Sequence, residues 1–315
     1  MSEAPIHRLS IPNPFFEGRN SVYVIRTDPI TLIDTGVATS KAFGVLQDEL
    51  KGLKLAVTDI RQVILTHKHI DHIGNAWRLQ QASDATILMH DLEKESITDI
   101  DPAGDRFARL VDKRLKTWGA PQTSDQVESA SKMPKWELEP AIATGVQDGQ
   151  TIPMEHGELQ FLHTPGHTLG SICIRYENQL FSGDHVLEKL SPNIGAGDLR
   201  QTGMLSRYME SLNRIAKLEA IETVLPGHGE PFSTLKPRCE ELLLHHQQRL
   251  DKLKSILETA NQTVYEIAIQ LFGEMNDFHV MLGCAEAYAH LEYLQERSVA
   301  QQSDGRWNLN VSPSS

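Results

Sequence analysis

Three histidines and an aspartate lie within six positions of one another in residues 66–75, THKHIDHIGN. The four residues are His67, His69, Asp71 and His72, and they directly follow a short apolar run. Imidazole and carboxylate groups together suit zinc, iron or manganese. Alternation along an extended backbone would place His67, His69 and Asp71 on one side, with His72 turning in from the next position. The stretch therefore predicts a metal-binding loop between a strand and a helix.

Three later strand-like runs end on side chains of the same kinds. These are His167 in TPGHTLGS, Asp184 in FSGDHVL and His228 in LPGHGEP. The glycines and prolines beside them let the backbone turn tightly, which leaves the side chains free to converge. Strand ends can meet at one rim of an α/β layered fold, so we expect all seven side chains to gather there. A single such histidine is more often structural than a ligand, and it is the whole set that indicates a metal site.

The rest of the chain alternates between strand and helix patterns. Residues 21–27 and 30–36 are β-rich runs separated by Asp28-Pro29, which predicts a hairpin. Further strands are expected in 59–67, 85–90, 158–164, 171–177, 179–185 and 223–229, and helices in 40–53, 74–83 and 207–220. This alternation is typical of an α/β architecture.

Residues 91–140 differ in character, because they are charged, helical over 105–119 and loop-like at their end. We interpret this stretch as an insertion. It lies between the metal motifs, so its apolar side chains could form a wall or lid over the site. The side chains in question are Phe107, Leu110, Trp118 and Trp136. A solvated helical decoration without a role is the alternative.

From about Leu235 the pattern becomes helical. Helices are expected in 239–260, 263–273 and 281–299, and 300–311 should form two short strands around an Asp-Gly turn. This combination suggests a small winged-helix-like domain at 236–315, appended to a larger domain at 1–235. Its charge argues against binding nucleic acid, because 239–315 contain five Lys or Arg and eleven Asp or Glu. Packing beside the site, or a homodimer contact, is the expected role.

The composition is that of an ordinary globular protein, with 40% apolar and 23% charged residues. The net charge of -12 argues against broad binding to nucleic acid or to an anionic membrane surface. No secretory signal is evident, and no apolar run approaches the roughly 18 residues of a membrane span. The widely spaced Cys173, Cys239 and Cys284 are expected to be buried apolar fillers in a cytoplasmic protein.

The ordered set T-H-x-H-x-D-H, T-P-G-H-T, S-G-D and P-G-H-G resembles the metallo-β-lactamase superfamily. Within that family it is similar to the glyoxalase II-like hydrolases and the lactamase-beta-2-like proteins. LIDTG at 32–36 resembles the family's first motif, and the resemblance covers about residues 15–235. It implies an α/β fold of the four-layer αββα type, followed here by the small C-terminal helical, winged-helix-like domain.

The resemblance also implies two divalent metal ions, with zinc expected and iron or manganese as alternatives. The seven rim residues match three ligands of a first metal, three of a second, and one bridging carboxylate: His67, His69 and His167; Asp71, His72 and His228; and Asp184. Asp71 and Asp184 are thereby the candidate catalytic residues. Asp34 matches a residue that orients a ligand histidine.

Hydrolysis is the chemistry expected from these ligands. Two metal ions about 3.5–4 Å apart can hold a bridging hydroxide at neutral pH and polarise the group that it attacks. A small-molecule ester, thioester or lactone is the expected substrate. Two alternatives are a compact endoribonuclease of the lactamase-beta-2 type and a mononuclear-iron oxidoreductase like the persulfide dioxygenases.

Residue choices within the motifs narrow the options inside the family. The flavodiiron pattern has Glu where this chain has His69, so reduction of oxygen or nitric oxide is not expected. True zinc β-lactamases mostly have Arg or another residue in place of His72, so hydrolysis of antibiotics is not expected as the main role. Only 43 residues separate Asp184 from His228. This interval is too short for the large inserted domain of the RNA-processing β-CASP enzymes, so membership of that group is not expected.

The other histidines are not expected to be ligands. His163 is interpreted as a strand residue near the site, and His185 should point to the face opposite Asp184. The remaining ones are interpreted as structural or solvated: His90, His156, His245, His246, His279 and His290.

Overall fold

The computed structural model describes residues 6–15, 17–101, 104–121, 136–196, 198–276 and 278–310. Two β-sheets form its centre. The first has the order β1-β2-β3-β4-β5-β6 and the second β11-β10-β9-β8-β7. The strands of the first sheet are β1 Ile6–Ile11, β2 Asn20–Ile25, β3 Thr31–Ile33, β4 Gln62–Ile64, β5 Thr86–His90 and β6 Ala143–Val146. Those of the second are β7 Thr151–Pro153, β8 Glu158–His163, β9 Ile172–Tyr176, β10 Gln179–Gly183 and β11 Thr223–Pro226.

Strand pairing is mixed in both sheets. Strands β1, β2 and β3 pair antiparallel, and β3 to β6 pair parallel. Among the described strands of the second sheet, β10 and β11 pair parallel and the other neighbours pair antiparallel. The predicted hairpin is confirmed, because Tyr23 pairs with Ile33 and Ile25 with Thr31. Strands β1, β6 and β7 were not predicted.

The helices of the first two thirds of the chain follow the predicted order, except that one four-residue helix and two 3₁₀ helices were not predicted. They are α1 Ser40–Gly52, α2 Ile70–Ile73, α3 Ala76–Ser83, α4 Asp105–Thr117 and α6 Met204–Ile215, with two 3₁₀ helices, η1 Val57–Asp59 and η2 Lys94–Ile97. Helix α1 begins where predicted because the hydroxyl of Thr39 accepts a hydrogen bond from the amide of Ala42 and caps the first turn.

Alternating side chains divide the core of the first sheet into two. Val22 and Val24 face helices α1 and α3, whereas Tyr23 and Ile25 face the second sheet. This period of two follows from the pleat of a strand whose two faces are both covered. Each fully buried aliphatic side chain contributes about 1.5–3 kcal/mol, so both faces stabilise the sheet.

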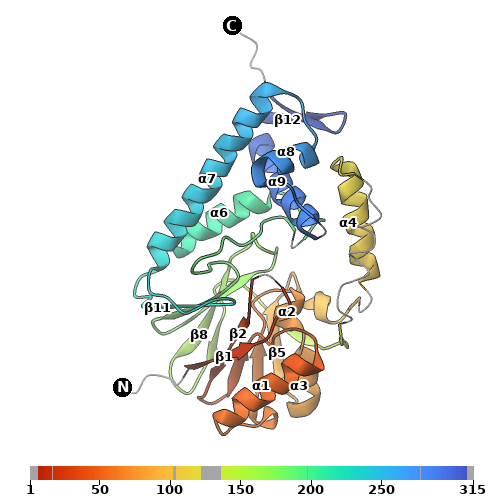
Figure 1. Cartoon of the computed structure of the whole chain (residues 1–315). Coiled ribbons are helices and arrows are strands. Elements are labelled where there is room, and N and C mark those ends of the chain that lie inside the picture. The colour runs from red at the N-terminus through yellow and green to blue at the C-terminus, as the bar shows by residue number, and fades with distance from the viewer. Residues whose placement is uncertain are drawn as a thin grey trace.

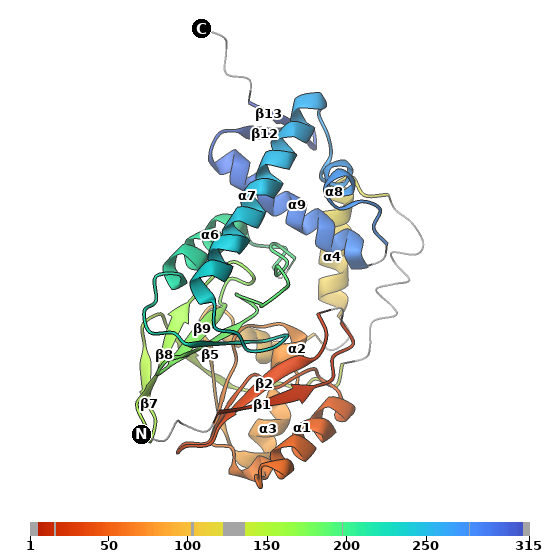
Figure 2. The same ribbon diagram turned by 60° about the vertical axis from the view of Figure 1, so that its left-hand side comes forward.

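The second sheet is covered in the same way. Phe181 and Leu225 face the first sheet, while Leu180 and Val224 join a cluster with residues of α6 and of the C-terminal helices. Figures 1 and 2 show α1 and α3 on one side of the sheets and α6 on the other. The α/β fold with helices outside two facing sheets is thus confirmed.

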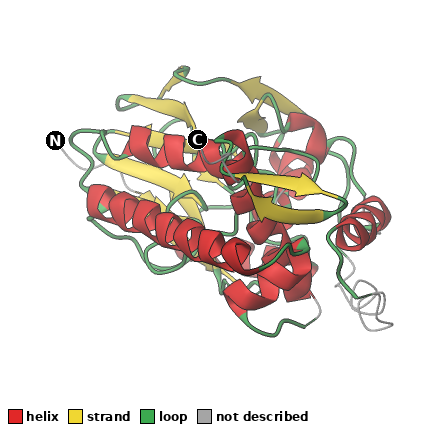
Figure 3. Ribbon diagram, turned by 90° about the horizontal axis from the view of Figure 1, so that it is seen from above, coloured by secondary structure: helices red, strands yellow, loops and turns green. Residues whose placement is uncertain are grey.

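Three helices and a hairpin form the C-terminal region, in the expected order. They are α7 Leu235–Thr259, α8 Val264–Phe272, α9 Phe278–Glu296, β12 Ala300–Ser303 and β13 Arg306–Leu309. Seen from above, they lie over the sheets (Figure 3). Helix α8 starts with a reciprocal capping box between Thr263 and Glu266. The likeness to a winged helix and the domain boundary near residue 236 stay predictions.

The inserted stretch contains the predicted helix, α4, which stands beside α8 and α9 (Figure 1). Leu110 and Trp118 pack toward the C-terminal helices, with the ring of Trp118 5.4 Å from that of Tyr288 on α9. Phe107 remains exposed. Residues 122–135 of the insertion lie outside the described residues.

The three cysteines are buried and free, as expected. Within the described part of the chain, no helix combines the length and apolarity needed to cross a membrane.

A buried glutamate on α9 predicts how stability depends on pH. Glu292 accepts a hydrogen bond from the amide of Gly203, and burial raises the pKa of Glu292 to about 7 from its ordinary 4.5. The stabilisation that comes with its protonated form is complete below pH 4.5 and is lost as pH rises through about 7. We expect Glu292→Gln to be as stable as wild type at pH 5 and more stable at pH 8, by about 2 kcal/mol.

Denaturant unfolding of both proteins at the two pH values, at equal metal content, measures this difference. A difference between variant and wild type that does not change with pH would contradict the prediction.

Candidate metal centre

All seven predicted side chains lie together at one rim. They follow strands β4, β8, β10 and β11, whose ends meet there. Two glycines allow the close approach of these loops. A Cβ on Gly227 would stand 2.3 Å from Oδ1 of Asp184, and one on Gly183, at φ +50°, would stand 2.8 Å from Thr66. Only a residue without a side chain fits at either point.

The predicted alternation along 66–75 is wrong in its second half. Residues 70–73 form the short helix α2, and the amide of His72 donates to the carbonyl of His69. Asp71 and His72 therefore reach the rim from successive positions of a helical turn. The sequence signal was ambiguous because four residues are too few to show a helical period.

Three histidines converge on one point of the rim. Nδ1 of His69 lies 3.1 Å from Nε2 of His67 and 2.9 Å from Nε2 of His167. Burial lowers the pKa of His67 and of His69 well below the ordinary value, so both are neutral at pH 7. One N–H at most can lie between each pair of nitrogens, whereas a metal ion can accept a lone pair from all three.

A second set of candidate ligands, Asp71, His72 and His228, lies beside the three histidines. Nε2 of His228 is 3.2 Å and Nε2 of His72 is 3.6 Å from Oδ2 of Asp71. Burial alone would raise the pKa of Asp71, but His72 and His228 outweigh it and keep the carboxyl ionised. Burial lowers the pKa of His72 and of His228, but the facing carboxylates outweigh it and raise both values, and a bound cation would compete with protons for these imidazoles.

Asp184 stands between the two groups. Its Oδ2 lies 3.4 Å from Nε2 of His228, 3.5 Å from that of His72, and 3.8 Å from that of His167. Oδ1 of Asp184 and Nε2 of His72 are buried without a hydrogen-bond partner. Burying a polar atom without a hydrogen-bond partner is costly, so a bound cation would supply the partner that these two atoms lack. The donor set of nitrogen and carboxylate oxygen fits two divalent ions of the zinc type.

Asp34 orients one of these imidazoles, in the place that the resemblance implies. Its Oδ2 accepts from Nδ1 of His72 at 2.8 Å, which leaves Nε2 for the rim. Both its oxygens also accept from Thr66, one from the amide and one from the hydroxyl. Asp34 has φ +61°, a left-handed conformation that Asp tolerates better than most residues.

The sequence did not indicate the residues that hold Asp71. Nδ2 of Asn13 and Nδ2 of Asn20 donate to its Oδ2 at 2.9 and 3.0 Å. On the same loop as Asn13, Glu17 has a buried Oε2 without a partner. Burial raises the pKa of Glu17, and the charges of Asp71 and Asp184 add to this effect. Polar and turn-forming neighbours made this stretch look like an ordinary surface loop.

Glu93 was missed as well. Its carboxylate is buried and accepts hydrogen bonds from the amides of Lys68 at 2.9 Å and Gly170 at 2.7 Å. One side chain therefore joins the loop of His67 and His69 to the loop of His167. Its neighbours are charged, which in the sequence is typical of a solvated face.

The other histidines lie away from the ligand positions. His163 stacks on His90 and contacts the carbonyl of Leu169. His185 is buried against Tyr208. His246 and His290, predicted to be structural or solvated, form a buried cluster with Glu286.

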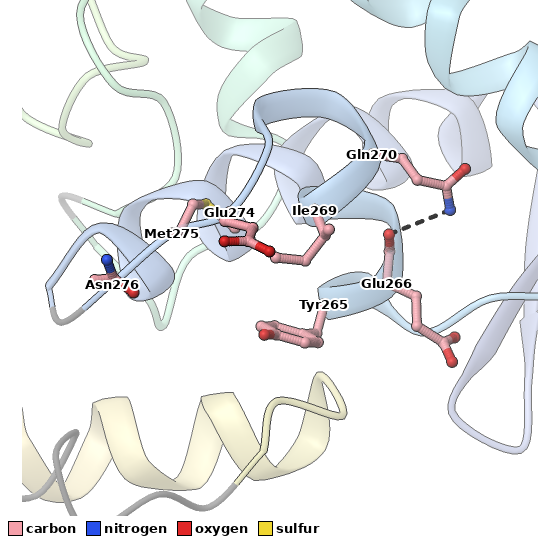
Figure 4. A pocket seen from close by; sticks show the side chains of 7 residues that line it. All are labelled: Tyr265, Glu266, Ile269, Gln270, Glu274, Met275 and Asn276. Atoms are coloured by element: carbon pink, nitrogen blue, oxygen red, sulfur yellow. Dashed lines mark hydrogen bonds between the residues drawn. The ribbon is translucent and has the colours of Figure 1, made fainter.

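A pocket of about 570 Å³ lies elsewhere, on α8 and the loop that follows it (Figure 4). Its lining residues are Tyr265, Glu266, Ile269, Gln270, Glu274, Met275 and Asn276. The carboxylate of Glu266 is already engaged by Thr263 and Arg306. Since the pocket contains none of the seven rim side chains, we place the candidate site at the rim.

Glu93 provides a test of how the loops are held. In Glu93→Gln the side-chain NH₂ group would face one of the two amides, so one hydrogen bond and the charge are lost. We expect affinity for Zn²⁺ to fall roughly 10-fold, the lower end of the effect of losing a residue that supports metal ligands. Competition with a chromophoric chelator measures it. The matched control is Glu95→Gln, an exposed glutamate on η2, and equal affinities in the two variants would refute the role of Glu93.

Comparison with known proteins agrees with this geometry. A family model described as "Metallo-beta-lactamase superfamily" matches residues 15–228. The "Probable metallo-hydrolase YqjP" of Bacillus subtilis is 27% identical over 315 residues, covering 97% of each chain. The human "Acyl-coenzyme A thioesterase MBLAC2" is 26% identical over 70% of this chain and 78% of its own.

Among solved structures, a metallo-beta-lactamase family protein from Thermus thermophilus, TTHA1429, is 28% identical. It superposes with a TM-score of 0.81 and covers 97% of this chain and 98% of its own. The similarity therefore extends through the C-terminal helices and not only through the two sheets. The chain belongs to the metallo-beta-lactamase superfamily.

Proposed function

We propose that this metal-dependent hydrolase uses two divalent ions, zinc in the first place, to cleave a small-molecule ester, thioester or lactone. The observation that carries the proposal is the complete second group of Asp71, His72 and His228, with Oδ2 of Asp184 between it and the first. A mononuclear site would not need both imidazoles of this group to face the same carboxylate.

The chain's own residues prepare the rim for such chemistry. Two bound ions supply a water activated at neutral pH and a Lewis acid for the substrate's carbonyl oxygen. His67, His72 and His228 are buried, which limits the access of bulk water that would compete with them for the metal ions. Asp34 fixes the tautomer of His72, while Asn13 and Asn20 fix the carboxylate of Asp71. This rigidity keeps the ligand atoms in place before substrate arrives.

A thioester is the first substrate class to test. The human relative is named as an acyl-coenzyme A thioesterase, and a thiolate leaves more readily than an alkoxide, which reduces the need for a proton donor. The net charge of -12 opposes association with RNA, which makes the endoribonuclease the weaker alternative.

An aromatic pair is suited to contact the acyl group. The rings of Phe15 and Trp136 lie 5.7 Å apart, and the amide of Phe15 donates to Asn13, which itself contacts Asp71. Trp136 belongs to the insertion for which a wall over the site was expected. We include these two rings, and not Trp118, in the proposed substrate wall, because Trp118 is buried against α9.

A substrate panel on protein of measured metal content tests the function. It contains an acyl-coenzyme A, an acyl-glutathione, a lactone and single-stranded RNA. We expect two equivalents of zinc or manganese and hydrolysis of at least one thioester, ester or lactone, with RNA left intact. Asp71→Ala and His167→Ala should lose both metal and hydrolysis, since each removes a ligand.

One equivalent of iron with oxygen uptake would instead identify an oxidoreductase. Full activity and full metal content in both alanine variants would refute the site itself.

A further inference from the structure

One backbone segment, residues 193–195, joins a rim histidine to helix α9. Nδ1 of His167 lies 2.9 Å from the carbonyl oxygen of Asn193. A carbonyl can only accept, so this nitrogen carries the proton and Nε2 keeps its lone pair toward the rim. The carbonyl of Asn193 therefore fixes the tautomer in which His167 can bind metal through Nε2.

The same peptide unit is held from its other side. The amide of Ile194 donates to Oε2 of Glu286 on α9 at 2.6 Å. The carbonyl of Asn193 and the amide of Ile194 belong to one planar trans peptide, in which the two groups point in opposite directions. This peptide thus lies between the carboxylate of Glu286 and the imidazole of His167.

The segment is docked closely on α9. Nδ2 of Asn193 donates to the carbonyl of Leu282 at 3.1 Å, and the side chain of Ile194 is fully buried. Gly195 has φ +102°, and a Cβ there would stand 2.7 Å from the carbonyl oxygen of Ala285. The peptide cannot rotate away from His167 without separating the segment from the helix.

Both oxygens of the Glu286 carboxyl accept hydrogen bonds within the protein, one of them from a cation. Oε1 accepts from Nη1 of Arg249 on α7 at 2.5 Å, and the guanidinium of Arg249 lies over the ring of Phe272. Burial raises the pKa of Glu286, and Arg249 opposes this effect. Both oxygens of the carboxylate therefore have partners, one on α7 and one in the 193–195 segment.

The neighbouring histidines support Glu286 and do not form another metal site with it. Nδ1 of His290 donates to the backbone carbonyl of Glu286 at 2.7 Å, so its Nε2 accepts from Nδ1 of His246 at 3.1 Å. Oε1 of Glu286 lies 3.9 Å from Nδ1 of His246 and already carries the Arg249 cation. A metal ion there would face that positive charge directly.

We propose that Glu286, paired with Arg249, is a positioning residue for the metal centre and acts through the Asn193–Ile194 peptide on His167. A carboxylate that accepts from the amide polarises the peptide and makes its carbonyl a stronger acceptor. The imidazole then donates more strongly from Nδ1, and its Nε2 becomes a more basic ligand. The inference rests on the proposed role of His167 as a metal ligand.

Glu286→Gln in the full-length protein tests this. The amide oxygen of Gln can still accept from Ile194, but the negative charge is gone. We expect Zn²⁺ affinity, measured by competition with a chromophoric chelator, to fall roughly 10-fold. We also expect the visible absorption band of the Co²⁺-loaded protein to shift, because the ligand field at His167 changes.

Glu292→Gln is the matched control. Glu292 lies on the same helix, is buried, and accepts from the amide of Gly203, but it does not touch the peptide that contacts His167. A merely structural role of α9 carboxylates would change both variants alike. Equal shifts in the two variants, or wild-type affinity and spectrum in Glu286→Gln, would overturn the proposal.

A second pair of variants keeps the test decisive if Glu286→Gln does not fold. Arg249→Lys retains the cation beside Glu286, whereas Arg249→Gln removes it. Because Arg249 opposes the rise in the pKa of the buried Glu286, its loss favours the neutral carboxyl, which polarises the peptide less. Zn²⁺ affinity should therefore be lower in the Gln variant than in the Lys variant. Equal affinities would count against the proposal. His167→Ala distinguishes failure of the ligand assignment from failure of the role of Glu286. If His167→Ala binds Zn²⁺ like wild type, the assignment of His167 as a ligand fails. If His167→Ala loses Zn²⁺ while Glu286→Gln does not, His167 remains a ligand and only the proposed role of Glu286 fails.

Discussion

Five imidazoles and two carboxylates approach one another within a few ångströms in a buried rim, and the rest of the structure is arranged around that approach. A cation stabilises such a cluster, because it satisfies lone pairs and negative charges that burial has removed from water. The two sheets bring strand ends from both halves of the sandwich to one place. Glycines at 183 and 227 then let the loops pass where any side chain would collide.

The ligands were predictable because their signals are local. Each motif combines a metal-binding side chain with a turn former at the end of an apolar run, and such a pattern survives in the linear sequence. The same holds for the hairpin of β2 and β3 and for helix α1, which have a turn or a cap of their own. Strands β6 and β7 have little apolar pattern, because their residues are mostly half-buried or exposed.

The residues that hold the ligands were not predictable in the same way. Glu93 lies in a charged stretch that is typical of a solvated surface. Glu286 lies in the apolar helical stretch 281–291, where the sequence does not show which groups its carboxylate contacts. Asn193 acts through its backbone carbonyl, which every residue possesses. Their roles depend on contacts between residues from 25 to 92 positions apart, and such contacts exist only once the chain has folded.

The docking of residues 193–195 on α9 bears on how this protein could be recombined with its relatives. The C-terminal helices share a core with the outer face of the second sheet, and they also touch the backbone beside His167. If only these helices were replaced by those of a relative, residues 193–195 would pack against side chains that differ from their own partners on α9. The unit of exchange is the connection from Asp184 to α6 together with α9, two stretches that are separate in the gene and inseparable in the fold.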